Sequence, residues 1–484
     1  MKPHPALLRL RAWRHGTPVL VIAVIFIASR VAAYGTGVRF RSNSLGTYLQ
    51  LVDPDLLRTR LLESLFYLHG QPPLFNLYLG VLLKAFPGHY AGVAQATYIV
   101  LGLIGALALY GLLVRVGCPT WVGVAVTAVI TVAPATIVYE NWLFYEYPVA
   151  VLLVLSAFAL AGFVRTKSFW PGFSFFLLLA AVIWIRTSFQ IVWMLLAAGL
   201  VVVALRDRTR LVLRASLVPL LLVVALCGKN LAMFGVASTS SWYGMTLAEK
   251  VFSSFSPADR ARRVERGDLS RVSLVYPYRQ GLDAYRGLVP LSRPTGIAVL
   301  DQIKLLSGTP NFNNKSYVRI SKLYLGDALH LIRDEPSAYL RSISSALKLS
   351  FRPSVEYPYT APNQQRTTFQ SYTQAFNHAV YAQTPYAGRI GLAILGAYAL
   401  ALLYGLRLLW LWFRGDRRSD PKVVTLLYIW LTVVYTSLVL ALVNFSAGER
   451  IRFAVDPLVA VLVTCAAVEV WPVLRRHRPR LVRG

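Results

Sequence analysis

Ten apolar runs, most of them about 20 residues long, constrain this chain more than any other feature of its sequence. They lie near residues 17–34, 92–114, 121–138, 148–164, 168–185, 188–205, 211–235, 387–412, 422–443 and 453–474. A helix of about 20 apolar residues crosses roughly 30 Å of hydrocarbon. Only 15% of the residues are charged, against about 25% in soluble domains, and the alternation typical of a membrane barrel is absent. We therefore expect an all-α polytopic protein of the cell membrane with about ten transmembrane helices.

The net charge of +29 could indicate a nucleic-acid-binding protein, but the positions of the basic residues argue against nucleic acid as a partner. Most of them gather at the ends of apolar runs, as the positive-inside rule produces. This pattern places both termini in the cytoplasm. No small-residue cleavage site precedes Arg30, so the first run is interpreted as an uncleaved span rather than a signal peptide. The outer face then receives the segments 35–91, 139–147, 186–187, 239–386 and 444–452.

The order of apolar and polar segments divides the chain into three parts. These are a transmembrane core at 1–238 with the first outer loop at 35–91, an extracytoplasmic cap of helices and loops at 239–386, and C-terminal transmembrane helices with a basic cytoplasmic tail at 387–484. Within the cap, residues 316–333 and 337–350 have apolar positions at helical spacing. Glu335-Pro336 is typical of a helix start, because proline fits the first helical turn.

The first outer loop contains acids directly after the first span. Asp53 followed by Pro54 is typical of an N-cap with proline at the first helical position, which predicts a helix over 53–68. Its leucines at 57, 61, 65 and 68 share one face, so we expect this helix to lie flat on the bilayer with that face down. Its first turn would present Asp53 and Asp55. Either carboxylate could be a general base; the alternative is that Asp53 only caps the helix.

A second short element follows in the same loop. Pro72-Pro73 predicts the start of an apolar helix over 73–86, which is only about 14 residues long and too short for an ordinary span. We interpret it as an interfacial or re-entrant helix. His69 and Gln71 precede it, and both are candidate groups for contact with the substrate or its phosphate. The alternative is that His69 is an ordinary interfacial residue.

Further charged residues fall at predicted outer ends of spans. Acids at membrane level are costly and tend to mark function, so Glu140 is the preferred second catalytic acid and Glu146 a candidate binding residue. The alternative is two solvated loop acids. Cations at this level could hold a lipid phosphate, because arginine matches phosphate with its planar fork; the alternative is snorkelling. The candidate phosphate-site residues are Arg186, Lys229, Glu449, Arg450 and Arg452.

The order of these motifs resembles the GT-C glycosyltransferase superfamily, above all over the first 240 residues. The features that resemble it are the acids of the first outer loop, Pro72-Pro73-Leu74, the acidic second loop, and Glu-Arg-Ile-Arg-Phe at 449–453. The aminoarabinose and protein-mannosyl branches have lysine before Pro-Pro, where this chain has Gln71. Their first-loop Asp-Glu pair is here Asp-Pro-Asp at 53–55. The resemblance implies Asp53 as catalytic base, with Asp55 as the near alternative.

The resemblance also implies an activity. We expect an inverting glycosyltransferase that moves a sugar from a polyprenyl-phosphate donor to a glycan, lipid or protein acceptor of the cell envelope on the outer face. No cofactor is required, although a divalent cation is compatible with two separated acids. Two alternatives stay open. One is a transporter or flippase of a lipid-linked glycan, which should show broken helices and internal symmetry. The other is a non-catalytic partner in envelope assembly.

Overall fold

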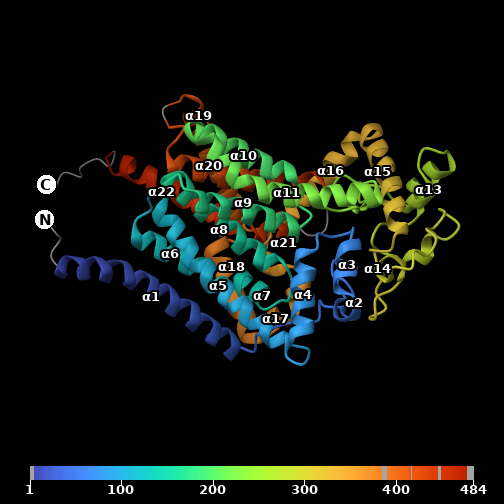
Figure 1. Ribbon diagram of the computed structural model, residues 1–484, viewed down its shortest axis with the longest axis horizontal. Coiled ribbons are helices and arrows are strands. Elements are labelled where there is room, and N and C mark those ends of the chain that lie inside the picture. The colour runs from blue at the N-terminus through green and yellow to red at the C-terminus, as the bar shows by residue number, and fades with distance from the viewer. Residues whose placement is uncertain (1–4, 384–389, 416, 445–447, 477–484) are drawn as a thin grey trace.

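Helices form nearly all of the regular structure of the chain. The computed structural model describes residues 5–383, 390–415, 417–444 and 448–476, and within these ranges it contains no strand, only three isolated bridges (Figure 1). Six helices are long and apolar enough to cross a membrane. They are α1 (Pro5–Gly35), α5 (Tyr90–Arg115), α8 (Glu146–Thr166), α11 (Thr209–Phe234), α19 (Leu392–Phe413) and α20 (Pro421–Leu442). The all-helical class expected from the sequence is therefore confirmed, and the candidate membrane-spanning helices among the described residues are consistent with a membrane protein.

A bent pair of helices forms a seventh candidate span or a re-entrant loop. The helices α6 (Thr120–Val132) and α7 (Pro134–Glu140) pass the same length and hydropathy criteria together, but their axes differ by 57°. The break lies at Ala133, whose backbone has φ −52° and ψ 132°. This conformation follows from Pro134, because a proline disfavours the helical region for the residue before it and cannot donate the next helical hydrogen bond.

About ten spans are not confirmed for the described residues. The helices α9 (Phe169–Ile185) and α10 (Ile191–Ala204) have only 17 and 14 residues, and α22 (Asp456–Arg476) is not among the candidate spans. The apolar run 188–205 overestimated α10, because its first three residues form the turn that follows Arg186. The apolar run is therefore longer than the helix that it forms.

The first loop folds as two helices rather than the single helix expected over 53–68. Asp53 caps α2 (Pro54–Thr59), as predicted, and its Oδ1 accepts from the Asp55 N–H. The chain breaks at Arg60 (φ −131°, ψ 44°) before α3 (Leu61–Tyr67). The expectation that the leucine face rests on the bilayer is wrong: the leucines at 57, 61, 65 and 68 are all buried inside the protein.

The short apolar helix α4 (Leu74–Ala85) begins after Pro73 as the Pro-Pro pair predicts. It packs against both α2 and α5. The contact with α3 is close, because a Cβ built on Gly80 would lie 2.2 Å from Leu61 Cδ1. The face of α3 that stays exposed carries Leu62 and Phe66 instead.

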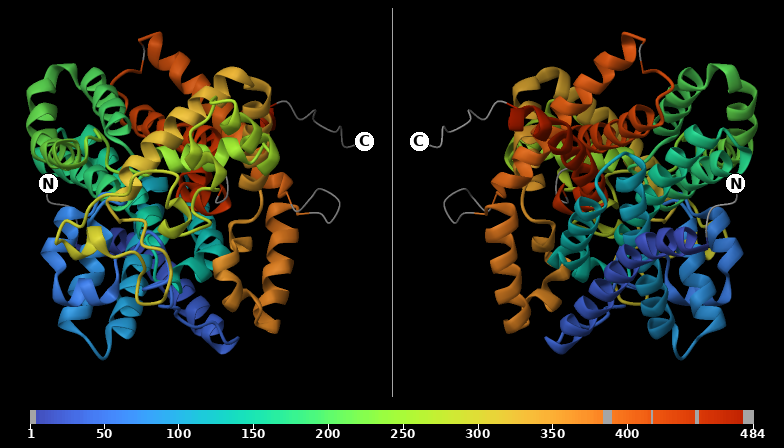
Figure 2. Two further views of the ribbon diagram at one scale, coloured as in Figure 1. Left: turned by 90° about the vertical axis from the view of Figure 1, so that its right-hand side faces the viewer. Right: turned by 90° about the vertical axis from the view of Figure 1, so that its left-hand side faces the viewer.

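The predicted cap contains its own hydrophobic core, but the last part of the predicted cap packs on the main core instead. Helices α12 (Tyr243–Phe252), α13 (Pro257–Glu265) and α15 (Ser316–Asp334) surround this core, which is built from residues between Trp242 and Leu331. The predicted start of α16 (Pro336–Ser350) after Glu335 is confirmed. The later helices α17 (Ala361–Gln364) and α18 (Thr367–Tyr381) lie beside the main bundle (Figures 1 and 2). Accordingly, Val355, Tyr357 and Phe369 belong to the main core.

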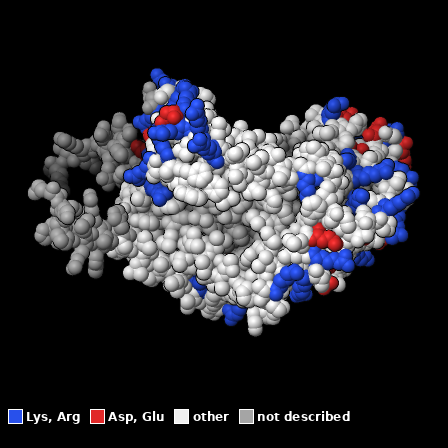
Figure 3. Space-filling view, viewed as in Figure 1, with Lys and Arg blue, Asp and Glu red and all other residues white. Residues whose placement is uncertain are grey.

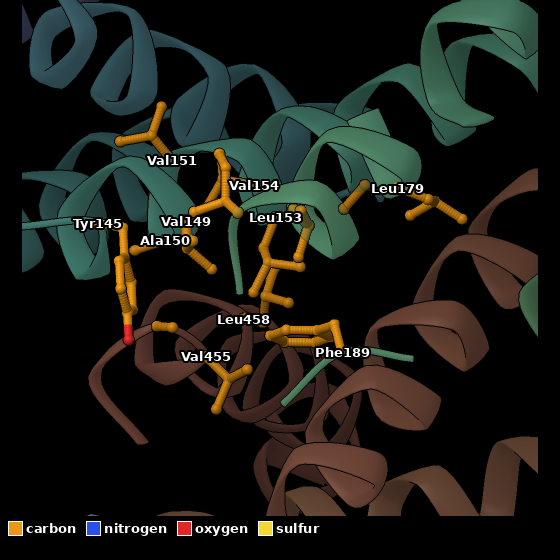
Figure 4. Packing of buried hydrophobic residues seen from close by; sticks show 14 of the residues in the cluster. Tyr145, Val149, Ala150, Val151, Leu153, Val154, Leu179, Phe189, Val455 and Leu458 are labelled. Atoms are coloured by element: carbon orange, nitrogen blue, oxygen red, sulfur yellow. The ribbon is translucent and has the colours of Figure 1, made fainter. Parts of the chain in front are cut away.

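Short helical segments complete the described elements. They are α14 (Ala298–Asp301), α21 (Gly448–Phe453), and the 3₁₀ turns η1 (Arg206–Arg208), η2 (Arg271–Leu274), η3 (Leu282–Tyr285), η4 (Ser354–Glu356) and η5 (Pro358–Thr360). In the main core, Leu153 of α8, Leu458 of α22 and Phe189 of the α9–α10 turn pack toward one another (Figure 4). This packing fixes the starts of α8 and α22 side by side.

Charged side chains separate from the apolar surface. In the space-filling view they gather toward the two ends of the molecule, and the broad central surface is almost free of them (Figure 3). Many large apolar side chains are exposed on the long helices, such as Leu20 on α1, Leu217 on α11 and Leu403 on α19. An apolar belt between two charged ends is what a bilayer requires of a protein that spans it.

The close packing of α12 on α15 leaves no room for a side chain at Gly244. A Cβ on Gly244 would lie 1.9 Å from the backbone oxygen of Ser321, whereas a Cβ on Gly326 meets nothing within 4 Å. We expect Gly244→Ala to force the two helices apart and destabilise the protein by about 1–3 kcal/mol. Gly326→Ala, the matched control within α15, should be neutral or stabilising by up to about 1 kcal/mol. Thermal unfolding in detergent measures both, and equal melting temperatures would contradict the close packing.

Candidate functional site

Three charged side chains meet deep inside the bundle. Glu146 begins α8, Arg186 follows the last residue of α9, and Arg450 lies in α21. Arg186 Nη1 forms an ion pair with Glu146 Oε2, and Arg450 Nε lies 3.2 Å from Glu146 Oε1. All three side chains are at most 10% exposed. Two guanidinium groups therefore share one carboxylate, and the cluster keeps one positive charge that its own acid does not neutralise.

The third of these groups, Arg450, is enclosed by aromatic rings. Its guanidinium carbon lies 5.4 Å from the centre of the Phe144 ring and 5.2 Å from that of Tyr357. Such contacts stabilise a cation that has lost its water. Nη1 of Arg450 is buried and has no hydrogen-bond partner among the described residues. This donor remains available to a ligand.

Glu140 occupies a separate ion pair. Arg30 of α1 donates to it through Nε (2.9 Å to Oε1) and Nη2 (2.7 Å to Oε2), and Tyr147 donates its hydroxyl hydrogen over 2.7 Å. Arg30 also donates to the carbonyl of Thr131. Both carboxylate oxygens of Glu140 are engaged, so this acid joins α1 to the α6–α7 break and to α8.

The two first-loop acids differ from each other. Asp53 is 1% exposed: while its Oδ1 caps α2, its Oδ2 accepts from the Leu306 N–H (2.7 Å) and from Gln302 (3.2 Å). It therefore ties the first loop to the cap. Asp55 is exposed, and its side chain forms no hydrogen bond or ion pair with the described residues. Neither carboxylate contacts the Glu146 cluster.

His69 and Lys229 tie the first loop to the cap and to α11. The ring of His69 hydrogen-bonds the Ser241 hydroxyl through Nδ1 (2.6 Å) and the Asn313 carbonyl through Nε2 (2.9 Å). Lys229 donates to the carbonyls of Phe66 (3.0 Å) and Leu68 (2.7 Å). The structure thus gives the Lys229 ammonium backbone partners instead of the anionic partner that the sequence suggested.

Gln71 is buried beside this junction. It is 6% exposed, and its Oε1 has no hydrogen-bond partner among the described residues. The neighbouring Gly70 leaves no room for a side chain, because a Cβ there would lie 2.3 Å from the Trp242 ring. The segment that precedes Pro72-Pro73 is therefore wedged between the first loop and the cap.

The start of α22 forms a second polar cluster with α21. Arg452 donates to Asp456 (Nη1 to Oδ1, 2.8 Å) and to the Ser354 hydroxyl (Nη2, 2.7 Å), while its Nε is buried without a hydrogen-bond partner among the described residues. The preceding Glu449 is 8% exposed, and its Oε2 has no such partner either. Burial raises the pKa of Glu449, although Arg352, Arg450 and Arg452 lower it in part.

An apolar groove of about 370 Å³ ends at this second cluster. Helices α6, α18, α19 and α22 form its walls, and Arg452 and Asp456 are its charged lining residues. The remaining lining is almost wholly aliphatic or aromatic, and it includes Val129, Ala133, Phe376, Val380, Ile394, Val459 and Val463. A groove of this kind suits a long hydrocarbon chain that carries an anionic group at one end.

The structure brings together only part of the predicted set. Glu146, Arg186 and Arg450 share one cluster, with Glu449 and Arg452 next to Arg450 in α21. The other predicted residues lie outside this cluster: Asp53, Asp55, His69, Gln71, Glu140 and Lys229.

Sequence reasoning did not single out Ser354 of the second cluster or Tyr357 beside Arg450. Asp456, the partner of Arg452, stands four residues after it in the sequence, at the start of the last apolar helix. Ser354 and Tyr357 carry no local signal. Among the described residues, no group of three or more His, Cys, Asp or Glu side chains is placed to hold a metal ion.

No family model, curated protein or solved structure matches this chain.

Breaking the buried Glu146 cluster should cost much more stability than breaking an exposed ion pair. Glu146→Gln would leave Arg186 and Arg450 buried without a counter-charge, which should cost about 3–5 kcal/mol of stability. The exposed Lys167–Asp207 pair (2.9 Å) is the control, and Asp207→Asn should cost less than about 1 kcal/mol. Thermal unfolding in detergent compares the two variants. Similar losses in both would show that the buried carboxylate does not hold the cluster.

The buried imidazole of His69 should make the stability of the protein depend on pH. Burial lowers the pKa of this imidazole from 6.5 to about 4, so between these values the unfolded chain binds more protons than the folded one. Stability should therefore fall as the pH decreases from about 6.5 to 4, by up to about 3 kcal/mol from this group. Melting temperatures measured across this range for the unaltered protein and for His69→Gln isolate the contribution. His89→Gln, at an exposed histidine, should leave the profile unchanged; an equal change in both variants would contradict the assignment.

Proposed function

We propose that this protein is an inverting glycosyltransferase that takes a sugar from a polyprenyl-phosphate donor. The observation that carries the proposal is the apolar groove between α6, α18, α19 and α22, with Arg452 at its charged end. A polyprenyl chain matches the apolar walls, and its phosphate matches a guanidinium group. The order of sequence motifs that resembles the GT-C superfamily supports the same activity.

Two unused donors suit the leaving phosphate. Nε of Arg452 and Nη1 of Arg450 are buried without hydrogen-bond partners among the described residues. In a site that excludes water, preorganised donors stabilise charge that develops on a leaving group, and this is often the largest catalytic term. Arg452 contacts the groove and is the proposed phosphate ligand. Arg450 supplies further positive charge from the Glu146 cluster.

The proposed general base is Glu449. One of its oxygens has no hydrogen-bond partner among the described residues, whereas both oxygens of Asp53 accept hydrogen bonds from the protein. A carboxylate whose pKa is raised by burial is also better matched to proton transfer near neutral pH. In the proposed step, Glu449 takes the proton of the acceptor hydroxyl as its oxygen bonds to the anomeric carbon. The bond from that carbon to the phosphate breaks, polyprenyl phosphate leaves, and the configuration inverts.

The sidedness of the reaction belongs to the same proposal. Basic residues at the ends of the apolar runs favour cytoplasmic termini. Arg452, Glu449 and the cap then lie toward the outer face, where the acceptor would be an envelope glycan, lipid or protein. The charged regions toward the two ends of the molecule, with an apolar surface between them on the face shown, agree with a protein that crosses the bilayer (Figure 3).

The base assignment predicts different outcomes for two carboxylates. Incubation of the purified protein with radiolabelled polyprenyl-phosphate sugars and envelope acceptors should release polyprenyl phosphate. Glu449→Gln should lower the rate at least about 100-fold, the usual minimum for loss of a general base, without lowering the melting temperature. Asp53→Asn should retain more activity but lower the melting temperature, because it weakens the cap of α2 and the tie to Leu306. The opposite pattern would return the role of base to Asp53.

A flippase for a lipid-linked glycan is the second candidate, and one observation favours it. The 57° break between α6 and α7 lies in the wall of the groove, because Ala133 lines the groove and is the residue at the break. Broken helices at a substrate path are typical of transporters. The second candidate is tested with the purified protein reconstituted in vesicles that contain the radiolabelled polyprenyl-phosphate sugars. Movement of intact lipid between leaflets without release of polyprenyl phosphate would support the flippase and contradict the glycosyltransferase.

A further inference from the structure

A polar cavity of about 570 Å³ lies on the side of α18 away from the apolar groove. Its volume falls within the range of about 300–1,000 Å³ typical of small-molecule sites. The lining comes from η4, α17, α18 and the residue Gln383. Although the whole chain has a net charge of +29, no lysine or arginine among the described residues lines this cavity. The cavity is therefore poorly suited to a phosphate or an anionic polymer.

Amide side chains dominate the lining. Six of the lining residues are glutamine or asparagine: Gln364, Gln365, Gln370, Gln374, Asn377 and Gln383. Each side-chain amide offers donors and an acceptor together. A sugar hydroxyl has the same dual character, so a dense array of hydroxyl groups matches a dense array of amides. A peptide would instead need apolar pockets or an exposed strand edge, and within the part of the chain that the structure describes the only aliphatic lining residues are Val355 and Ala361.

One buried acceptor in this lining lacks a partner. Asn377 is 4% exposed, and its Oδ1 has no hydrogen bond from the described residues. A buried polar atom without a partner costs about 1–3 kcal/mol. A ligand hydroxyl that donates to Oδ1 would recover that energy. The exposed side chains of Gln374 and Gln370 stand one and two turns away, respectively, on the same face of α18.

The sequence of α18 separates two chemistries on two faces. Gln370, Gln374 and Asn377 face the polar cavity, whereas Phe376 and Val380 line the apolar groove. The neighbouring segment also joins the two regions. Glu356 of η4 lines the cavity, Ser354 of η4 binds Arg452, and Tyr357 packs on Arg450.

We infer that this cavity binds a neutral oligosaccharide through the amide side chains of α17 and α18. The binding itself stands on the cavity. The assignment of that oligosaccharide as the acceptor of the transfer reaction rests on the proposed function. In that assignment, α18 places the acceptor glycan on its amide face and the lipid tail of the donor on its apolar face.

Binding is tested on the full chain in detergent micelles with neutral trisaccharides of gluco, manno, galacto and arabino configuration. Saturation-transfer NMR detects contact, and calorimetric titration gives the affinity. At least one trisaccharide should bind, and the double variant Gln370→Ala/Gln374→Ala should weaken it at least tenfold. Ser371→Ala alters an exposed residue of the same helix that does not line the cavity, so it should bind as the unaltered protein does. Because these three positions are exposed, the variants should fold normally.

The following results would contradict the inference. No binding of any trisaccharide at 10 mM (roughly the weak limit of useful affinity) would overturn it, as would equal affinity in the double variant. Preference for an anionic oligogalacturonide or for a glutamine-rich peptide over every neutral trisaccharide would overturn it too. The proposed function fails separately: trisaccharide binding without release of polyprenyl phosphate would leave the glycan site standing and remove only its role as acceptor site.

Discussion

The pairing of one buried carboxylate with two guanidinium groups is the constraint on which the arrangement of the bundle depends. Glu146 stands at the start of α8, and its partners come from the end of α9 and from α21. A charge in an apolar interior is costly unless it is paired, so these three elements cannot move apart independently. The aromatic rings of Phe144 and Tyr357 enclose the remaining positive charge. A fixed cation that exceeds its counter-charge is a natural place for an anion.

The same principle distinguishes acids whose oxygens all have partners from an acid with an unpartnered oxygen. Glu140 and Asp53 have both oxygens engaged by the protein, and each joins segments that are distant in the sequence. Glu449 is buried with one oxygen that lacks a partner among the described residues. A buried acid without a full set of partners reduces stability, and such groups are more readily explained by chemistry than by folding. This distinction moved the proposed base from the first loop to α21.

Sequence patterns predicted the local features well and the spatial ones poorly. The cap of α2, the start of α4 after Pro73, and the helices on either side of Glu335 followed from short-range rules. The prediction that the leucine face of the first loop rests on lipid was wrong, because that face is covered by protein. Periodicity identifies an apolar face but does not show which surface covers it. The partners of Lys229 are backbone carbonyls, and no sequence pattern shows where a carbonyl lies. The amide face of α18 was readable as Gln370, Gln374 and Asn377 at helical spacing, but only the fold showed a cavity beside it.

The two faces of α18 would allow the proposed glycan site and the proposed lipid groove to lie in one small region. The proposed reaction needs a polar surface for the acceptor glycan and an apolar surface for the lipid tail of the donor, only a helix width apart. An amphipathic helix provides this separation, since residues three or four apart share a face and their neighbours point away. Phe376 and Asn377 are adjacent in the sequence, yet one lines the groove and the other the cavity. The η4 segment then connects both faces to Arg450 and Arg452, so the charge that would hold a phosphate lies where the two chemistries meet.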